Sequence, residues 1–545
     1  MTLARMVLER VNFLRKTSLE DMQLLLLVRL YQIIAPEDGD GGNYGDGCIF
    51  VGVLASTAVS IGLNRKIDNM IKTDTFARTA DSFHNLWGKL WLTCMEMDLE
   101  LSLVYGKKPY IDIDDWDTPF PSTDIKNTNL RDFYVDKYSI DRLSKFRKMY
   151  SELYLLVTSV HKLRKPPAIK DVLLHIDDIM KMCNQLYPVN FQEGYLTADV
   201  FSLDVINSIK SILVIYPFIL NVQYYILLHY ESTDQFDKFL VLFNQIIDNV
   251  LYALEISIGT FVHIFTTMSA HALMLNAYII QAVNKIIYIL LSFSVHVRLA
   301  GYRVESRISK DGERMYSEVR ESQEHLKSQF ELLRENIFAI MKLANKCPAF
   351  SLEHYYTSFR SYGNCKCLIG WTKKGGKPIF DFEDPSWLEH SNLIEGFSKE
   401  QVQSVNQKIA KFLSLDSCVK LGEMTKRWSS NPDNCSFKFN DYCPKIDASG
   451  KIVLNTGMLN YKKSKGDILS TKMRHMSSID SKSKDGSGSS ILQTGDGTAL
   501  NNDANNLGML TSTDPSFEGL ESADNWLQIP DLVDSLDIMS ELGML

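Results

Sequence analysis

The most constraining feature of this 545-residue sequence is a long run without charged side chains. No Asp, Glu, Lys or Arg occurs from Ile256 to Asn284, and after Lys285 the uncharged run continues from Ile286 to Val297. Such a run is long enough to span a membrane. Polar side chains recur within it, however, and hydrocarbon penalises them strongly. We therefore predict a buried pair of central helices rather than a membrane span.

Helical periodicity extends over most of the chain, from Ser18 to about Asn345. Two typical series of apolar side chains are Val205, Ile209, Leu213, Tyr216 and Leu220, and Leu240, Phe243, Ile247, Val250 and Leu254. A spacing of three to four residues places each series on one helix face. No alternation typical of strands occurs before Gly363. We therefore predict an all-α fold, a large helical bundle or array.

Local residues predict where two helices begin and end. Thr17 or Ser18, followed by Glu20 and Asp21, is typical of a helix start. Near the end of the helical region, Met315 to Lys346 predicts one long amphipathic helix. We expect Pro348 to end it, because proline lacks the N–H that a helix interior requires.

Composition indicates a large folded protein that is not secreted. Apolar residues make up 45% of the chain and aromatic residues 11%, which is typical of a globular body in one large or two closely packed domains. The segment from Met1 to Arg15 is amphipathic, so it does not resemble a cleavable signal. Nine cysteines, an odd number without regular spacing, predict reduced thiols.

The sequence contains no combination of residues typical of catalysis or metal binding. The loop from Pro36 to Gly47 is acidic but lacks the glycine and the glutamate that a calcium-binding loop places at fixed positions. Cys365 and Cys367 are separated by one residue, whereas zinc sites usually begin with two. We interpret His263 and His271 as core histidines. We therefore expect no enzyme activity and no metal or cofactor in this chain.

A specific motif lies between Gly45 and Pro121. Its principal residues are Gly62, Leu63, Arg65, Trp87, Trp91, Asp98, Gly106 and Pro109. Trp87 and Trp91 are four residues apart, so they share a helix face and are expected to seal it against the body. Gly106 and Pro109 predict a turn. We therefore interpret the motif residues as structural.

This motif resembles the regulatory middle-homology region of fungal zinc-binuclear-cluster transcription factors. In that family a helix ends in Gly-Leu-His-Arg, and a Trp-rich helix, a Gly-x-Pro turn and an acidic exit follow. Asn64 occupies the position of the usual histidine. The resemblance implies a helical regulatory domain over residues 1–362 of a nuclear regulator of RNA polymerase II transcription. It leaves open a homodimer and a small-molecule effector as partners.

The zinc cluster that binds DNA in this family is missing from the sequence. That cluster begins with two Cys-x-x-Cys pairs in a basic stretch, and the first cysteine here is Cys48, within the motif region. We therefore expect an amino-terminal truncation relative to the family. Zinc and promoter DNA would then be bound only by a module upstream of Met1. The motif's acidic residues, Asp112 to Asp117, predict a solvated or capping loop rather than a metal site.

Beyond the helical region the composition changes in three steps. Glycine and proline interrupt residues 363–443, which we predict to be an irregular segment packed on the body. Residues 444–513 are poor in aromatic side chains and predict a disordered linker. The final segment, 514–545, lies within a stretch, 485–545, that has eleven acidic residues and no Lys or Arg. Because the rest of the chain has a net charge of +3, this stretch accounts for the total of −8.

The final segment has the pattern of an acidic activation tail. Pro530 can occupy the first turn of a short helix that ends near Leu542, and a lone helix of this length folds only on contact. Its apolar row would enter a coactivator groove while its acids accelerate the encounter. The residues expected to bind are Trp526, Leu527, Ile529, Leu532, Val533, Leu536, Met539 and Leu542. The resemblance implies a coactivator such as Mediator.

Two alternatives remain beside this interpretation. The tail could instead dock on its own body as a carboxy-terminal cap. The whole chain could be an α-helical enzyme or a small-molecule-binding protein without a role at DNA. An enzyme would require an acid, base or metal cluster that the sequence does not show.

Overall fold

Long helices dominate the chain, as the periodicity predicts. The computed structural model describes residues 17–34, 44–67, 81–162, 164–189, 203–267, 272–311, 316–350, 362–363, 365–366, 369, 392–430, 445–446 and 452–453. Residues 1–438 form one compact unit and residues 439–545 a second. The first unit contains only helices among its described residues, so the all-α prediction is confirmed for the body.

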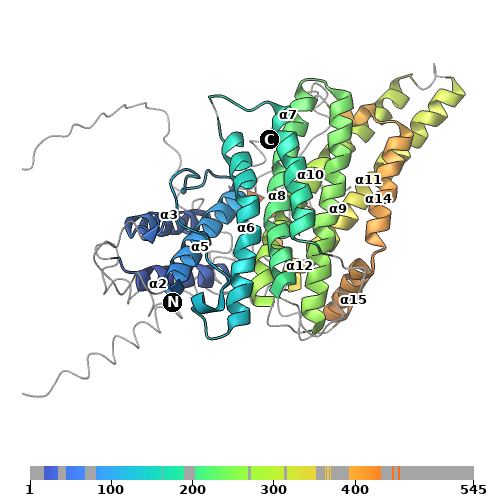
Figure 1. Ribbon diagram of the computed structural model, residues 1–545. Coiled ribbons are helices and arrows are strands. Elements are labelled where there is room, and N and C mark those ends of the chain that lie inside the picture. Colours follow the sequence, from blue (N-terminus) through green and yellow to red (C-terminus); the bar gives the residue numbers. More distant parts are fainter. Residues whose placement is uncertain are drawn as a thin grey trace, which may run out of the picture. The chain divides into compact units, whose positions relative to one another are not determined.

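The helices of the body lie in the following order. They are α2 (Leu19–Ile34), α3 (Tyr44–Ser60), α5 (Asp81–Tyr105), η1 (Ile125–Asn127), α6 (Phe133–Val160), α7 (Ile169–Leu186), α8 (Leu203–Ser232), α9 (Phe236–Thr267), α10 (Ala272–Asp311), α11 (Ser317–Ala344), α12 (Lys346–Phe350), η3 (Leu393–Gly396), α14 (Lys399–Leu413) and α15 (Asp416–Ser430). Helices α8 to α11 lie side by side along the body (Figure 1). The short connections between them make neighbours in sequence neighbours in space.

Helices α8, α9 and α10 form the centre of the core. The ring centroids of Phe243 in α9 and Phe293 in α10 are 4.9 Å apart, and Phe397 lies 5.2 Å from Phe243. The hydroxyl of Tyr224 in α8 is hydrogen-bonded to that of Ser292 in α10. The prediction that the uncharged run forms a buried helix pair is confirmed for the described residues of the run, which lie in α9 and α10.

The long helix predicted from Met315 to Lys346 is present as α11, but Pro348 does not end it. Asn345 caps α11, and Pro348 is the third residue of α12, which follows directly. Proline is tolerated there because the N–H groups of a first helical turn have no partner within the helix. The expected stop is therefore the start of a new, short helix.

The prediction of an irregular segment from 363 to 443 is wrong for residues 399–413 and 416–430. Ser398 and Gln401 form a capping box that begins α14. The buried side chains of α14 recur at helical spacing and pack on α11 and α9. Helix α15 packs on α9 and α11 as well. The sequence contains local signals for these helices. The prediction missed them because it relied on the glycines and prolines that precede α14.

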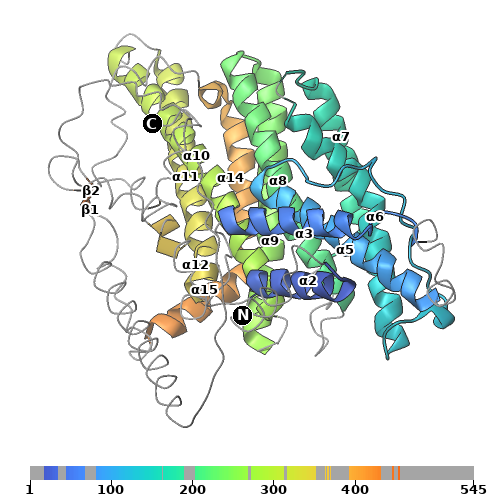
Figure 2. The same ribbon diagram turned by 90° about the vertical axis from the view of Figure 1, so that its left-hand side faces the viewer.

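The amino-terminal helices lie across the ends and sides of the long ones. Helices α2 and α3 run crosswise to α9 and α10 (Figure 2). Of the two predicted start residues, Thr17 and Ser18, Ser18 precedes α2: its backbone N–H donates to Asp21 and its hydroxyl accepts from the Asp21 N–H, at 2.9 and 3.2 Å. Helix α5 contacts α3, α6 and α8, so it connects the motif region to the core.

The described residues of the second unit form two short strands. Strands β1 (Lys445–Ile446) and β2 (Ile452–Val453) pair antiparallel, with Lys445 opposite Val453 and Ile446 opposite Ile452. These residues fall within the predicted disordered linker, which therefore has secondary structure at these four positions.

Candidate functional site

The motif region begins with a glycine turn at the end of α3. Gly62 has φ of 80°, a conformation that glycine adopts without strain. The N–H of Leu63 donates to the Ala58 carbonyl and the N–H of Gly62 to the Val59 carbonyl, both at 2.9 Å. These bonds satisfy carbonyl groups at the helix end. The turn buries Leu63 completely, as a structural role for this pair would require.

The acidic exit of the motif docks onto this same turn. Asn64 donates its side-chain amide to the Asp115 carbonyl at 2.8 Å, and its own carbonyl accepts the Asp117 N–H at 2.9 Å. The Asp117 carboxylate accepts the N–H of Lys66 at 2.8 Å. The side-chain amide and the backbone carbonyl of Asn64 therefore both bind the acidic segment. Hydrogen bonds of Asp115 and Asp117 therefore hold the acidic loop on the turn.

Helix α5 seals this turn with its two tryptophans. Trp87 is 8% exposed and Trp91 is 1% exposed, so both side chains are buried in the body. The indole N–H of Trp87 donates to the Arg65 carbonyl at 3.1 Å. Arg65 thus contributes through its backbone.

The far end of α5 holds the segment after the Gly106 turn. Gly106 has φ of 61°, and the N–H of the next residue, Lys107, returns to the Ser102 carbonyl at 3.2 Å. The carboxylate of Asp98 accepts the N–H of Tyr110 at 3.1 Å and that of Ile111 at 2.8 Å. Burial raises the pKa of Asp98, and the two backbone hydrogen bonds partly oppose that shift. The turn predicted from Gly106 and Pro109 is therefore anchored by Asp98.

Three residues of α5 that sequence reasoning missed complete this arrangement. Asn85 donates to the carbonyls of Ser122 and Asn127 at 2.7 and 3.0 Å and accepts the Ser122 N–H. Gly88 allows close packing, because a Cβ there would lie 2.9 Å from the Pro119 carbonyl oxygen. Lys89 forms a buried ion pair with Asp136 of α6.

A second group of charged side chains joins α5 to the core. Arg142 of α6 donates to both carboxylate oxygens of Glu96. Lys210 of α8 lies 2.7 Å from Glu100 and 3.7 Å from Glu96. Its ammonium also lies 5.3 Å from the ring centroid of Tyr278 in α10. These five residues, which we name the α5 ion network, link four helices.

Burial and charge act in opposite directions within the α5 ion network. Burial alone would raise the pKa of Glu96, but Arg142 and Lys210 outweigh it and hold that pKa below its usual range. Burial would likewise lower the pKa of Lys210, yet Glu100 raises it. Glu96, Arg142 and Lys210 are therefore charged at neutral pH. Its sequence signal is the pair Glu96 and Glu100, four residues apart on a largely apolar helix.

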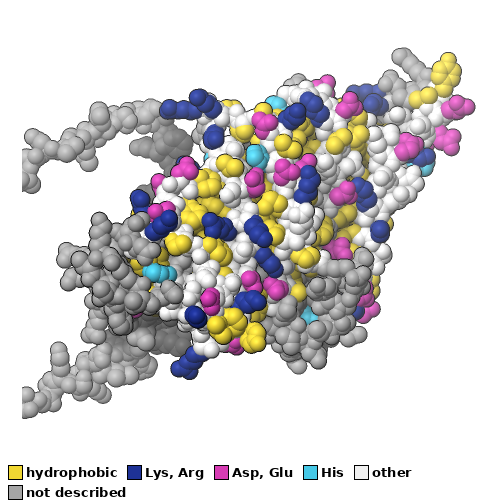
Figure 3. Space-filling model, in the orientation of Figure 1, with side chains coloured by type: hydrophobic (Ala, Val, Ile, Leu, Met, Phe, Trp, Pro, Cys, Tyr) yellow, Lys and Arg dark blue, Asp and Glu magenta, His cyan; other side chains and the backbone are white. Residues whose placement is uncertain are grey.

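Other predicted positions carry no site among the described residues. No group of three His, Cys, Asp or Glu side chains suited to a metal ion occurs there. His263 lies on α9, and burial lowers its pKa; His271 and all eight predicted coactivator-binding residues, Trp526 to Leu542, lie outside the described residues. On the face in Figure 3, basic and acidic side chains are interspersed rather than gathered by sign.

Three described helices, α8, α9 and α10, are long and apolar enough to cross a membrane by length and composition alone. In the folded body, 72%, 56% and 78% of the residues in their most apolar windows are buried. Protein atoms therefore cover most of the surface that lipid would cover in a membrane.

Comparison with known proteins found similarity in the part of the chain that contains the motif region. Residues 4–246 match the family described as "Fungal specific transcription factor domain". Two relatives are "Multidrug resistance regulator 1" of Candida albicans, 26% identical over 42% of this chain, and "Oleate activated transcription factor 3" of Zygosaccharomyces rouxii, 26% identical over 17% of it. The matched parts span 20% and 13% of these relatives' lengths. No solved structure matches significantly.

The family match includes the whole of the motif region described above. The match covers α2 to α8 and the first residues of α9, and every principal motif residue lies inside it. The family is a regulatory one, not an enzyme family. Residues 4–246 of this chain are therefore similar to the fungal-specific transcription factor domain.

Proposed function

We propose that this chain is part of a nuclear transcription regulator. Its helical body would control an acidic C-terminal segment that recruits a coactivator. The observation that carries the proposal is the family match over residues 4–246, together with a motif whose residues all serve packing and hydrogen bonding. A body held together in this way would transmit or restrain the effect of another module.

In this proposal, promoter DNA is bound only by a separate module. The sequence has no pair of Cys-x-x-Cys motifs, so zinc-dependent DNA contact would come from a zinc cluster preceding these residues in a longer protein. A homodimer remains part of the proposal, since two-fold DNA sites favour dimeric readers. One relative is named for multidrug resistance and the other for activation by oleate, which supports a small-molecule effector acting on the helical body.

The activation segment is proposed to be residues 514–545, after the linker 444–513. Its support is the sequence: acidic side chains separate apolar ones at helical spacing after Pro530. Such a segment binds a partner groove with its apolar face. A large coactivator assembly such as Mediator is the proposed partner.

A reporter assay tests the activation segment. Residues 514–545 are fused to an unrelated DNA-binding domain, and reporter transcription is measured beside two variants. We expect strong activation by the natural segment. Replacing Trp526 and Leu536 by alanine should abolish it, because both fill the partner groove, whereas replacing Asp534 and Asp537 by asparagine should reduce it only partly. A silent natural segment, expressed at the same level, would refute its activating role.

The body's control over the segment is tested in the whole chain. The same DNA-binding domain is fused before Met1 of the full chain and of a variant that lacks residues 81–162, the α5–α6 region. We expect weaker activation by the full chain than by the variant. Equal activation by both would leave the segment active but would contradict control by the body.

A further inference from the structure

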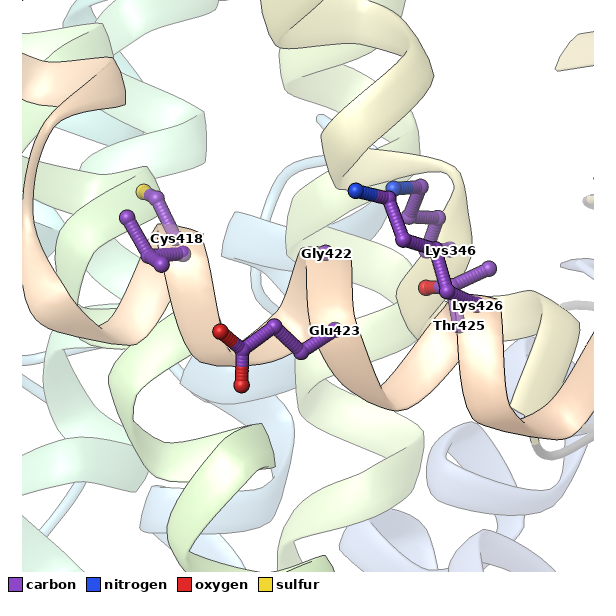
Figure 4. Close-up of a pocket in the computed structure, with 7 residues that line it drawn as sticks. Lys346, Cys418, Gly422, Glu423, Thr425 and Lys426 are labelled. Carbon is purple, nitrogen blue, oxygen red and sulfur yellow. The ribbon is translucent and has the colours of Figure 1, made fainter.

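A pocket of about 650 Å³ opens beside α15, in a part of the body that lies beyond the family match. One side of α15 supplies most of its lining, and the start of α12 supplies the rest (Figure 4). The lining residues are Lys346, Cys418, Val419, Gly422, Glu423, Thr425 and Lys426. Volumes of this size are typical of sites for small molecules.

Two lysines mark one end of the pocket. Lys346 of α12 is half-buried and Lys426 of α15 is exposed, and their side chains extend in the same direction (Figure 4). Burial lowers the pKa of Lys346, and the positive charge of Lys426 lowers it further. Among the described residues, no carboxylate forms an ion pair with either ammonium group. An anionic group between them would relieve their repulsion.

The remaining lining limits where a ligand can carry charge. Burial raises the pKa of the Cys418 thiol to about 11, so that group is neutral at physiological pH. The side chain of Val419 is 49% exposed, and Gly422 adds open space, since a Cβ there would meet no atom within 4 Å. The Glu423 carboxylate lies away from the lysines (Figure 4) and would repel a second anionic group.

We propose that this pocket binds a small organic anion: a carboxylate with an apolar body, whose negative group pairs with Lys346 and Lys426. Its body would lie over Val419 and the space beside Gly422. Because α15 packs on α9 and α11, an occupant would contact the edge of the core. The inference deepens the proposed effector of the helical body and rests on that proposal.

Calorimetric titration of the purified 545-residue chain tests the ligand class. The probe is octanoate at constant ionic strength, compared with octylamine, which has a similar apolar body and a positive head, and with acetate, which has the head alone. We expect octanoate to bind at least about tenfold more tightly than either, since only octanoate satisfies both the lysines and the apolar lining. Equal binding of octylamine would overturn the proposal.

Three variants test the site itself. Lys346→Gln with Lys426→Gln should weaken octanoate binding at least about tenfold. The control is Lys420→Gln, which removes an exposed lysine of the same helix that is paired with Asp416 at 2.6 Å, and it should bind like the natural chain. Gly422→Leu should block binding with both lysines present, because its side chain fills the open space.

The outcomes separate this inference from the wider proposal. An unchanged affinity in the double lysine variant, whose helical content is checked by circular dichroism, places octanoate elsewhere and overturns the site. No binding of octanoate to the natural chain overturns it too. Neither result bears on the reporter assays of the activation segment, because the titration involves no DNA and no transcription.

Discussion

The carboxylate of Asp98 and the backbone N–H of Ile111 form a buried hydrogen bond of 2.8 Å that joins α5 to the segment after it. The same carboxylate accepts the N–H of Tyr110. The side chain of Tyr110 then crosses α3, where its hydroxyl donates to the Cys48 carbonyl at 3.1 Å. One side chain thus fixes the position of a segment that connects two helices.

Replacing Asp98 by alanine should destabilise the protein by about 2–4 kcal/mol, because two backbone N–H groups would lose their acceptor inside the fold. The free energy of unfolding is measured by urea denaturation. Asp115→Ala is the matched control: its side chain is exposed and its structural role rests on its backbone carbonyl. A loss of equal size in both variants would contradict the anchoring role of Asp98.

Glycine substitutions should separate steric from conformational effects. Gly88→Ala places a Cβ 2.9 Å from a backbone oxygen and should cost about 1–3 kcal/mol. Gly106→Ala meets no atom within 4 Å, so its cost of about 1 kcal/mol should come from the positive φ alone. Gly422→Ala, in open space on α15, should stabilise the helix by about 0.5–1 kcal/mol. Thermal unfolding of the three variants gives the order, and a reversed order would refute this assignment.

The α5 ion network should show strong coupling between its members. Arg142→Met leaves the Glu96 carboxylate short of a partner in a largely buried position and should cost about 3 kcal/mol or more. Adding Glu96→Gln should recover part of that loss. Lys145 lies on the same helix as Arg142, and Lys145→Met, which breaks an exposed pair with Asp204 of α8, should cost at most about 1 kcal/mol. Strictly additive losses for Arg142 and Glu96 would show that the two groups are not coupled.

Stability should rise with pH above neutrality because of Lys285. Its ammonium, half-buried on α10, donates to the Val104 carbonyl at the end of α5, and burial lowers its pKa from 10.5 to about 8. Between these values the unfolded chain binds more protons than the folded one, so the unfolding free energy increases with pH. We expect a rise of about 2 kcal/mol from pH 7 to 9.5 that Lys285→Met removes. An identical pH profile in both proteins would contradict the lowered pKa.

Much of the architecture followed from local pattern. The uncharged run, the helical spacing of apolar residues and the Ser18 start predicted long buried helices, because each signal depends on neighbours within one or two turns. The glycines of the motif predicted turns for the same reason: positive φ is a property of one residue. The capping box of Ser398 and Gln401 was equally local. The glycines and prolines before it in the sequence nevertheless led to the prediction of an irregular segment where α14 and α15 lie.

The α5 ion network and the lysine pair could not be predicted this way. Glu96, Arg142 and Lys210 are far apart in sequence, and each is common on an exposed helix face. Only packing shows which carboxylate meets which cation, since pairing depends on the relative rotation and register of whole helices. The roles of Asn64 and Asn85 likewise became clear from the carbonyl groups that lie beside them.

The sequence by itself determined the helical class, the motif and the charge of the carboxy-terminal stretch. Tertiary structure decided how that motif works: α5 holds the glycine turn through Trp87 and the following segment through Asp98. It also brought α12 and α15 together and so created the pocket that Lys346 and Lys426 help to line. The physical reason is the separation along the sequence of the residues involved. Turns and helices depend on neighbouring residues, whereas burial and charge pairing arise only when segments distant in the sequence pack together.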